Sequence, residues 1–248
     1  MRSSLKLNKL IILLLILTLG SQRIQAQWST GSDIMSRYVW RGMDFGASPS
    51  IQPYIEYANS GFTLGAWGAY SMNGSQGQEA DLYLTYSFLK ERITVSLTDY
   101  FFPNELLKND YFNFRKGETT HLFEGTILFN GTETFPMTFL VATTLYGDDL
   151  DAEGKHRFSS YTELGYGFKT KEGITLDLFA GANLTRQSEA DQAAEWDAFY
   201  GNKAGLINLG LSAQKEIEIT SQFSLPLSVS LMSNPMAGNI FFVFGIHL

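Results

Sequence analysis

Residues 79–88 read EADLYLTYSF, and this stretch decides the fold class. Every second position from Ala80 to Phe88 is apolar, while the positions between them carry carboxyl or hydroxyl groups. Strict alternation places the two sets of side chains on opposite faces of a β-strand. Ten residues are also enough for a tilted strand to cross a bilayer, because such strands need about 9 to 11 residues. The stretch therefore predicts a two-faced strand with one apolar surface.

The same alternation recurs along the chain, with no apolar run of helical-span length after Gln27. Short turns and mostly longer loops alternate between the segments, which is typical of an outer-membrane barrel with both chain ends on the periplasmic side. We therefore predict an all-β fold, a transmembrane antiparallel up-and-down β-barrel of about twelve strands. The strands are expected near residues 31–41, 50–58, 62–71, 79–88, 92–102, 118–129, 136–146, 157–168, 174–184, 204–213, 219–232 and 239–248.

Aromatic residues gather at the ends of these segments, on the apolar face. This placement matches the two interfacial girdles of a membrane barrel, whereas a soluble β-sandwich places its aromatic residues in a core. A soluble periplasmic β protein is the alternative fold. The girdle residues beside short turns are Tyr57, Phe62, Tyr86, Phe88, Phe129, Tyr166 and Phe168, and those beside long loops are Tyr38, Trp40, Tyr70 and Phe101.

The N-terminal residues 1–26 have the pattern of a cleaved signal peptide. A basic start is followed by a short apolar core and by a small residue, Ala26, at the expected cleavage position. The apolar core is too short to span a bilayer comfortably. We therefore expect export, with residues 27–248 forming a single outer-membrane barrel domain in the bacterial cell outer membrane.

The composition excludes several classes of function. Asp and Glu number 25 against 18 Lys and Arg, which argues against a nucleic-acid partner because phosphate binding needs a basic face. The chain has no Cys, so thiolate metal sites and cysteine nucleophiles are absent, and its three His residues are not paired as zinc ligands. Asp149 begins a calcium-loop-like run, but Ser160 stands where a bidentate Glu is needed. We expect no metal, no cofactor and no enzymatic activity.

The segment from Ser32 to Gly42, SDIMSRYVWRG, resembles the first strand of the TorF-type porin family of bacterial outer-membrane proteins. Further landmarks follow in order at residues 54–57, 61–68, 79–83 and 99–103, and beyond Pro103 only the general barrel pattern persists. The resemblance implies an outer-membrane barrel that conducts small solutes, and it implies no catalytic residue.

The ionisable residues on the polar face become the pore-lining candidates if the apolar face meets lipid. Seven acids against two bases predict a weak preference for cations. Alternatively, the two arginines are neutralised by Glu56 and other acids in cross-strand pairs, because barrel interiors also hold polar networks. The candidates are Asp33, Arg37, Arg41, Glu56, Glu79, Asp81, Glu124, Glu163 and Asp177.

The longest loop, residues 185–203, offers Glu195, Trp196 and Phe199 as candidates for a constriction of the mouth. If these residues instead face outward, the loop favours a plugged structural or surface-binding barrel. A membrane-embedded hydrolase is a further alternative, in which His121, His156 or His247 would serve as the base. The expected function is a porin-like channel for small solutes, with outer-membrane lipid, lipopolysaccharide and the barrel insertion machinery as partners.

Overall fold

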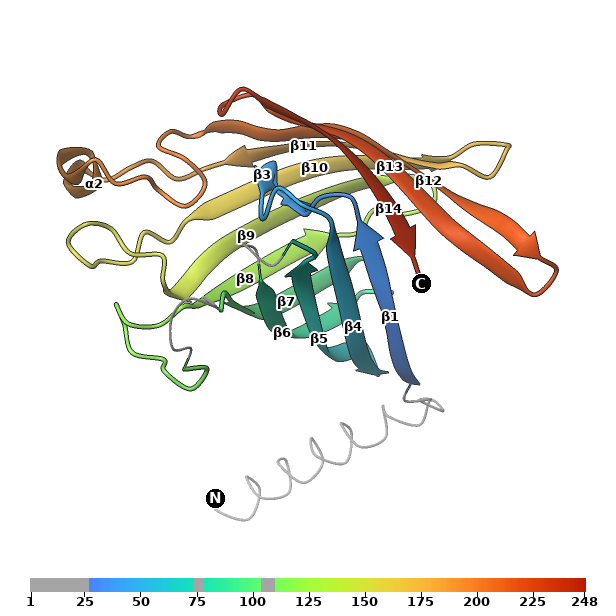
Figure 1. Ribbon diagram of the computed structural model, residues 1–248, viewed down its shortest axis with the longest axis horizontal. Coiled ribbons are helices and arrows are strands. Elements are labelled where there is room, and N and C mark those ends of the chain that lie inside the picture. Colours follow the sequence, from blue (N-terminus) through green and yellow to red (C-terminus); the bar gives the residue numbers. More distant parts are fainter. Residues whose placement is uncertain (1–26, 74–77, 104–109) are drawn as a thin grey trace, which may run out of the picture.

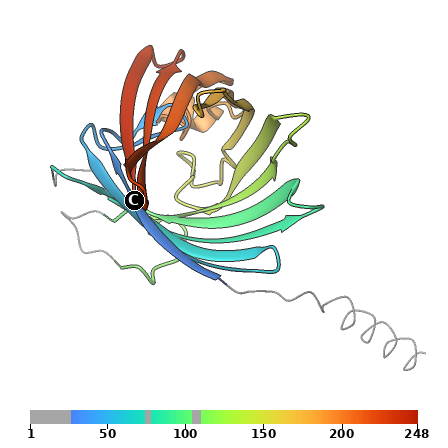
Figure 2. The same ribbon diagram turned by 90° about the vertical axis from the view of Figure 1, so that its right-hand side faces the viewer.

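The computed structural model describes residues 27–73, 78–103 and 110–248. The predicted signal peptide, residues 1–26, lies outside the described residues. Twelve antiparallel strands form a closed up-and-down barrel, which confirms the predicted fold class (Figures 1 and 2). The barrel strands are β1 (Gln27–Met35), β4 (Ser50–Asn59), β5 (Phe62–Ser71), β6 (Glu79–Phe88), β7 (Ile93–Phe101), β8 (His121–Phe129), β9 (Met137–Gly147), β10 (Ser160–Lys169), β11 (Thr175–Asn183), β12 (Gly205–Thr220), β13 (Phe223–Asn234) and β14 (Asn239–His247).

The first and last strands close the barrel along a short seam. β1 and β14 pair in register from Asp33 opposite His247 to Met35 opposite Gly245. Two further backbone bonds join Ser32 and Leu248, with N···O distances of 3.1 and 2.9 Å. Closure leaves β1 and β14 without free edges along the seam, so the backbone groups there are satisfied within the sheet.

The first strand is shorter than predicted. β1 ends at Met35, and residues 39–44 form a separate two-stranded hairpin, β2 (Val39–Trp40) and β3 (Met43–Asp44). Its two turn residues, Arg41 and Gly42, have φ values of 48° and 76°, as a tight hairpin turn with the right twist requires. Tyr38 and Trp40 therefore leave the barrel wall, and their assignment to an outer girdle was wrong.

β12 is longer than the strand that was expected at residues 204–213. It runs without a break to Thr220, and the turn to β13 lies at residues 221–222 rather than at 214–218. Alternation continues through Ile217 and Ile219, so the strand pattern itself extends beyond the expected end. The resulting hairpin projects past the neighbouring strands in Figure 1.

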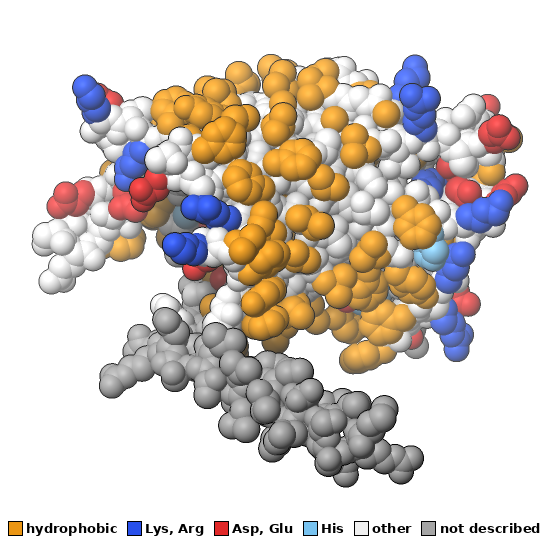
Figure 3. Space-filling model, turned by 180° about the vertical axis from the view of Figure 1, so that it is seen from behind, with side chains coloured by type: hydrophobic (Ala, Val, Ile, Leu, Met, Phe, Trp, Pro, Cys, Tyr) orange, Lys and Arg blue, Asp and Glu red, His pale blue; other side chains and the backbone are white. Residues whose placement is uncertain are grey.

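The outer face of the barrel is apolar. Large hydrophobic side chains are exposed on the strands, and Figure 3 shows them spread over the middle of the face seen there, with Lys, Arg, Asp and Glu side chains mostly at its two ends. No helix in the described ranges is long and apolar enough to cross a membrane. The outward-facing residues include Leu64, Leu84, Leu97, Ile127, Leu164, Leu178, Leu211, Leu231 and Phe242.

On the inner face, glycines leave room for aromatic rings from the adjacent strands. A Cβ atom added at Gly65 would collide with the ring of Tyr83, and one added at Gly210 would collide with the ring of Phe179. Tyr83 uses this space to donate a 2.7 Å hydrogen bond from its hydroxyl to Glu56. The glycines therefore fix the positions of ring side chains that shape the lumen.

We expect Gly65→Val to lower the free energy of unfolding by about 1–3 kcal/mol, because the added side chain displaces the Tyr83 ring and its bond to Glu56. Urea unfolding of the detergent-folded barrel measures the change. Gly167→Val is the matched control, since a Cβ there meets only the flexible end of the Asp177 side chain. Equal destabilisation by the two variants would contradict the prediction.

Candidate functional site

A buried ion pair spans the lumen. Arg41, at the tip of the β2–β3 hairpin, reaches Glu124 on the inner face of β8. The contact is bidentate, with Nη1 to Oε2 at 2.5 Å and Nη2 to Oε1 at 2.9 Å. Only 10% of the Arg41 side chain and 1% of the Glu124 side chain are exposed. A charge-assisted pair with this geometry holds the hairpin inside the barrel.

Aromatic side chains surround this ion pair. The Arg41 guanidinium lies 4.3 Å from the ring centre of Trp40 and 4.7 Å from that of Tyr161, distances suited to cation–π interaction. The Tyr200 hydroxyl hydrogen-bonds with both Arg41 and Glu124. The Tyr100 hydroxyl donates to Glu124 at 3.1 Å. We call Arg41, Glu124 and these four aromatic residues the plug cluster.

The hairpin tip is also fixed to the barrel wall. Gly42 lies so close to β12 that an added Cβ would collide with the backbone carbonyl of Ile207. On the neighbouring strand, the Asn234 side-chain amide donates to the Gly42 carbonyl at 3.2 Å. The plug cluster is therefore anchored on three strands, β8, β12 and β13.

The seven acidic candidates all lie on strands at positions that face the lumen, as their register shows. Of these, Asp33 contacts His247 at 2.7 Å and Glu124 contacts Arg41, while in the described part of the chain the other five form no ion pair. Glu79 and Asp81 are buried beside Tyr38 and contact each other. The five acids without a basic partner are Glu56, Glu79, Asp81, Glu163 and Asp177.

The two arginine candidates lie in the inward-folded segment rather than on β1. Arg37 pairs with Asp44 of the same segment at 3.1 Å, and its side chain is 38% exposed. Neither arginine neutralises Glu56, which instead accepts hydrogen bonds from Ser29 and Tyr83. The prediction that Arg37 and Arg41 sit on the first strand was wrong, because the chain turns inward after Met35.

A hollow of about 460 Å³ lies in the lumen between the plug cluster and the short turns. Its lining includes Glu163 and Asp177 on the barrel wall and Glu133 in the turn between β8 and β9. None of these three carboxylates forms an ion pair among the described residues. The lining of this hollow is therefore acidic.

The long loop between β11 and β12 is divided between two environments. Phe199 packs against Trp40, with ring centres 6.2 Å apart, and Tyr200 enters the plug cluster. Glu195 is instead the C-cap of the short helix α2 (Glu189–Ala194), Trp196 follows it, and both side chains are exposed. Figure 1 shows α2 away from the barrel strands. The prediction that Glu195 and Trp196 constrict the mouth was therefore wrong. Tyr200 of the same loop lies inside the barrel instead.

A second ion pair explains why α2 stays outside. Arg157, in the loop after β9, binds Asp191 of α2 through two bonds of 2.9 and 2.7 Å. Asp191 also accepts bonds from the backbone N–H groups of Ala152 and Ser188. The Arg157 guanidinium holds the pKa of the Asp191 carboxyl well below its usual range, with a further contribution from the Ser188 hydroxyl. The two loops are therefore tied together beyond the mouth of the barrel.

Asp99 is an acidic residue on the outer face of β7. Its carboxylate contacts His121 Nδ1 at 2.7 Å, and His121 Nε2 contacts the Tyr111 carbonyl at 2.7 Å. The rings of Phe101 and Phe114 cover the histidine, which is fully buried. Strict alternation along β7 puts Asp99 on this face, opposite Phe123, and the contact with His121 explains how a carboxyl group is accommodated there.

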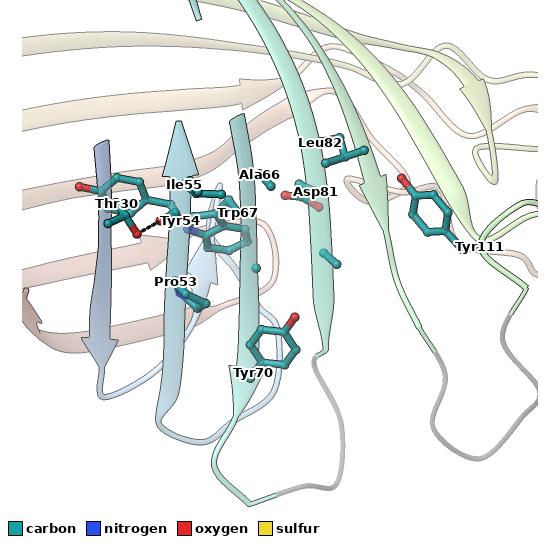
Figure 4. Close-up of a pocket in the computed structure, with 12 residues that line it drawn as sticks. Thr30, Pro53, Tyr54, Ile55, Ala66, Trp67, Tyr70, Asp81, Leu82 and Tyr111 are labelled. Carbon is teal, nitrogen blue, oxygen red and sulfur yellow. Dashed lines mark hydrogen bonds between the residues drawn. The ribbon is translucent and has the colours of Figure 1, made fainter. Parts of the chain in front are cut away.

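An apolar hollow of about 510 Å³ lies on the outer face across β1, β4, β5 and β6 (Figure 4). Small residues such as Pro53 and Ala66 form its floor, and Tyr70 and Tyr111 stand at its rim. Because these outward side chains face away from the lumen, this hollow belongs to the outer surface rather than to a solute path.

Within the described ranges, no three His, Cys, Asp or Glu side chains are grouped so that they could hold a metal ion. The chain matches no known family model, no curated protein and no solved structure.

We expect Glu124→Gln to release the hairpin from the lumen. Removing one partner of a buried ion pair costs about 3–5 kcal/mol when the other charge stays buried, and outward movement of the hairpin relieves that cost. Met43→Cys, the sole thiol in a cysteine-free chain, lies against the cluster of Tyr161 and Ile207 and reports the movement. Its labelling by a membrane-impermeant maleimide should accelerate at least tenfold in the Glu124→Gln background.

The control for this labelling is Trp196→Cys, because this exposed position should react fast in both backgrounds. An unchanged, slow rate for the Met43→Cys thiol in both backgrounds would show that the ion pair does not hold the hairpin.

The Arg157–Asp191 pair predicts the pH dependence of the two loops. Because the pKa of Asp191 is lowered by folding, the pair stabilises the loops fully above the unfolded pKa of about 4 and loses this effect as pH falls through the lowered value. Hydrogen exchange of residues 189–198, corrected for intrinsic rates, should be constant from about pH 8 to 5 and accelerate only below about pH 4. In Asp191→Asn, exchange should be fast throughout; a slow, unchanged rate would contradict the prediction.

Proposed function

We propose that this protein is an outer-membrane channel for small solutes, with an acidic lumen that weakly favours cations. The single observation that carries the proposal is the combination of an apolar outer face with an inner face on which five acids have no basic partner among the described residues. Uncompensated carboxylates lower the energy of a cation and raise that of an anion in a narrow water-filled passage.

The outer surface supports a place in the bacterial outer membrane. Apolar strand faces suit the hydrocarbon, and rings such as Phe62 and Tyr86, whose centres lie 4.3 Å apart, stand beside the short turn after β4 as an interfacial girdle. The export signal predicted at the N-terminus and the resemblance of residues 32–42 to the TorF-type porin family agree with this location. Outer-membrane lipid, lipopolysaccharide and the barrel insertion machinery are the proposed partners.

The plug cluster gives the proposed channel its narrow point. The inward hairpin and Tyr200 fill the side of the lumen near the long loops, while the hollow beside Glu163 and Asp177 remains open. A solute that enters from the short-turn end meets carboxylates first and then the Arg41–Glu124 pair. The same filling favours a second candidate, a barrel that is plugged and serves a structural or surface-binding role.

Planar-bilayer recording of the refolded barrel in a KCl gradient tests the proposal. The expected result is stable conductance steps with a reversal potential of the cation-selective sign. Glu163→Gln together with Asp177→Asn should move that potential toward zero, because these variants remove charge from the lumen wall. Glu189→Gln on α2 is the matched control, since it removes an exposed charge outside the lumen and should change nothing.

Arg41→Ala separates the two candidates. Larger conductance steps in this variant than in the unaltered barrel would support a channel that the plug cluster narrows. Anion selectivity, or silence of both proteins after correct folding is shown by heat-modifiable gel migration, would overturn the channel proposal in favour of the plugged barrel.

A further inference from the structure

Three polar side chains from adjacent strands meet on the inner face beside the seam. His247 on β14 lies between Asp33 on β1 and Ser228 on β13. The Asp33 carboxylate contacts His247 Nδ1 at 2.7 Å, and the Ser228 hydroxyl contacts His247 Nε2 at 2.9 Å. Both ring nitrogens of this histidine are therefore bound, one by a carboxylate and the other by a hydroxyl.

This is the arrangement by which a histidine activates a serine. A carboxylate that accepts the Nδ1–H proton fixes the tautomer in which Nε2 accepts the proton of the serine hydroxyl. We propose that Ser228, His247 and Asp33 form a catalytic triad in the lumen wall that hydrolyses small carboxylic esters. Ser228 is the nucleophile, His247 the general base and acid, and Asp33 the residue that orients the imidazole.

The other two histidines do not have this arrangement. His121 contacts a carboxylate through one ring nitrogen, but its second ring nitrogen contacts the Tyr111 carbonyl. Its ring lies on the outer face of the barrel, where neighbouring side chains bury it fully. His156 lies against the rings of Tyr146 and Phe158. Among the described residues, His247 alone joins an acid to a hydroxyl group.

The seam holds the triad in place. The two backbone bonds between Ser32 and Leu248 flank the register pair of Asp33 and His247, so strand pairing sets the distance between the acid and the base. Gly245 stands directly opposite Ser228, and a Cβ there would collide with the Ser228 hydroxyl. The glycine therefore leaves the space that the hydroxyl occupies.

The triad is accessible from the lumen. The side chains of His247 and Asp33 are 27% and 32% exposed, unlike the buried plug cluster. On β13, Asn234 contacts the hairpin at Gly42, and Ser228 lies six residues nearer the short turn that begins this strand. A substrate therefore reaches Ser228 from the short-turn end, and the acids along that path select uncharged or cationic esters.

The proposed reaction balances with water as the second reactant. The Ser228 Oγ attacks the acyl carbon while its proton passes to His247 Nε2, and the resulting oxyanion collapses with cleavage of the ester C–O bond. Nε2 returns the proton to the departing alkoxide, which leaves as an alcohol. Water then attacks the acyl-serine with His247 as base, releasing the carboxylic acid and restoring the Ser228 hydroxyl.

Gln214 offers a side-chain amide for the developing oxyanion. It stands directly opposite Ser228 on β12, and its position in the alternation faces the lumen. Side chains at directly opposite positions have Cβ atoms about 4.5–5.5 Å apart, which brings an amide of this length within reach of an acyl oxygen on Ser228.

Labelling by a fluorophosphonate tests the triad, because this probe transfers its phosphonyl group to an activated serine with loss of fluoride. The folded barrel in detergent should be labelled on Ser228, found by mass spectrometry of the peptide 216–248, and should hydrolyse p-nitrophenyl butyrate until labelling is complete. Ser228→Ala should lose the label, and His247→Gln and Asp33→Asn should each slow labelling at least about a hundredfold.

Ser230→Ala is the matched control. Ser230 lies on the same face of the same strand, but its hydroxyl contacts Ser212 at 2.7 Å and no histidine. This variant should be labelled at the unaltered rate. Equal urea midpoints and heat-modifiable migration establish that each variant is folded, and Asp33→Asn still tests the triad if His247→Gln does not fold.

Two results would overturn the triad: no label on Ser228 in the folded barrel, or labelling of His247→Gln and Asp33→Asn at the unaltered rate. The experiment is independent of conduction, since it is made in detergent and the probe enters below the plug cluster. A barrel that is labelled but silent in bilayers would contradict the channel alone.

Discussion

The backbone pairing between β1 and β14 is the constraint on which the rest of the structure depends. A barrel has a defined inside only when its first and last strands are joined, and here three register pairs and the bonds between Ser32 and Leu248 make that join. Closure turns a periodic sequence into two separate surfaces, one apolar and one polar. It also brings Asp33 beside His247, residues 214 positions apart in the chain.

The Arg41–Glu124 pair shows how a charged contact can specify an arrangement without adding much stability. Taking both charges out of water costs several kcal/mol per ion, and a close bidentate contact returns only part of that cost. The rings of Trp40 and Tyr161 and the hydroxyl groups of Tyr100 and Tyr200 supply further interactions that offset the remainder. The hairpin has few other ways to satisfy these groups, so the pair fixes one position for it.

Sequence periodicity predicts the barrel well and the lumen only in part. Strands such as residues 62–71 and 79–88 agree with the structure to the residue, because alternation and turn residues are local signals. The inward turn after Met35 was missed, since residues 36–41 continue to look like a strand. Glu195 and Trp196 were misplaced for a different reason: their position depends on the Arg157–Asp191 contact between two loops, which no local pattern encodes. The proposed role of Ser228 likewise depends on its contact with His247 on the next strand, which the local sequence does not show.

The extended β12–β13 hairpin has a consequence for how the barrel sits in a bilayer. β12 pairs with β11 only as far as Gln214 opposite Thr175, so residues 215–220 are bonded on one side alone, to β13. Hydrocarbon cannot solvate the unpaired N–H and C=O groups of that edge. In the proposed membrane location this edge would therefore stand in the headgroup layer or in water, and the level of Gln214 would mark the depth at which the acyl chains end on this side of the protein.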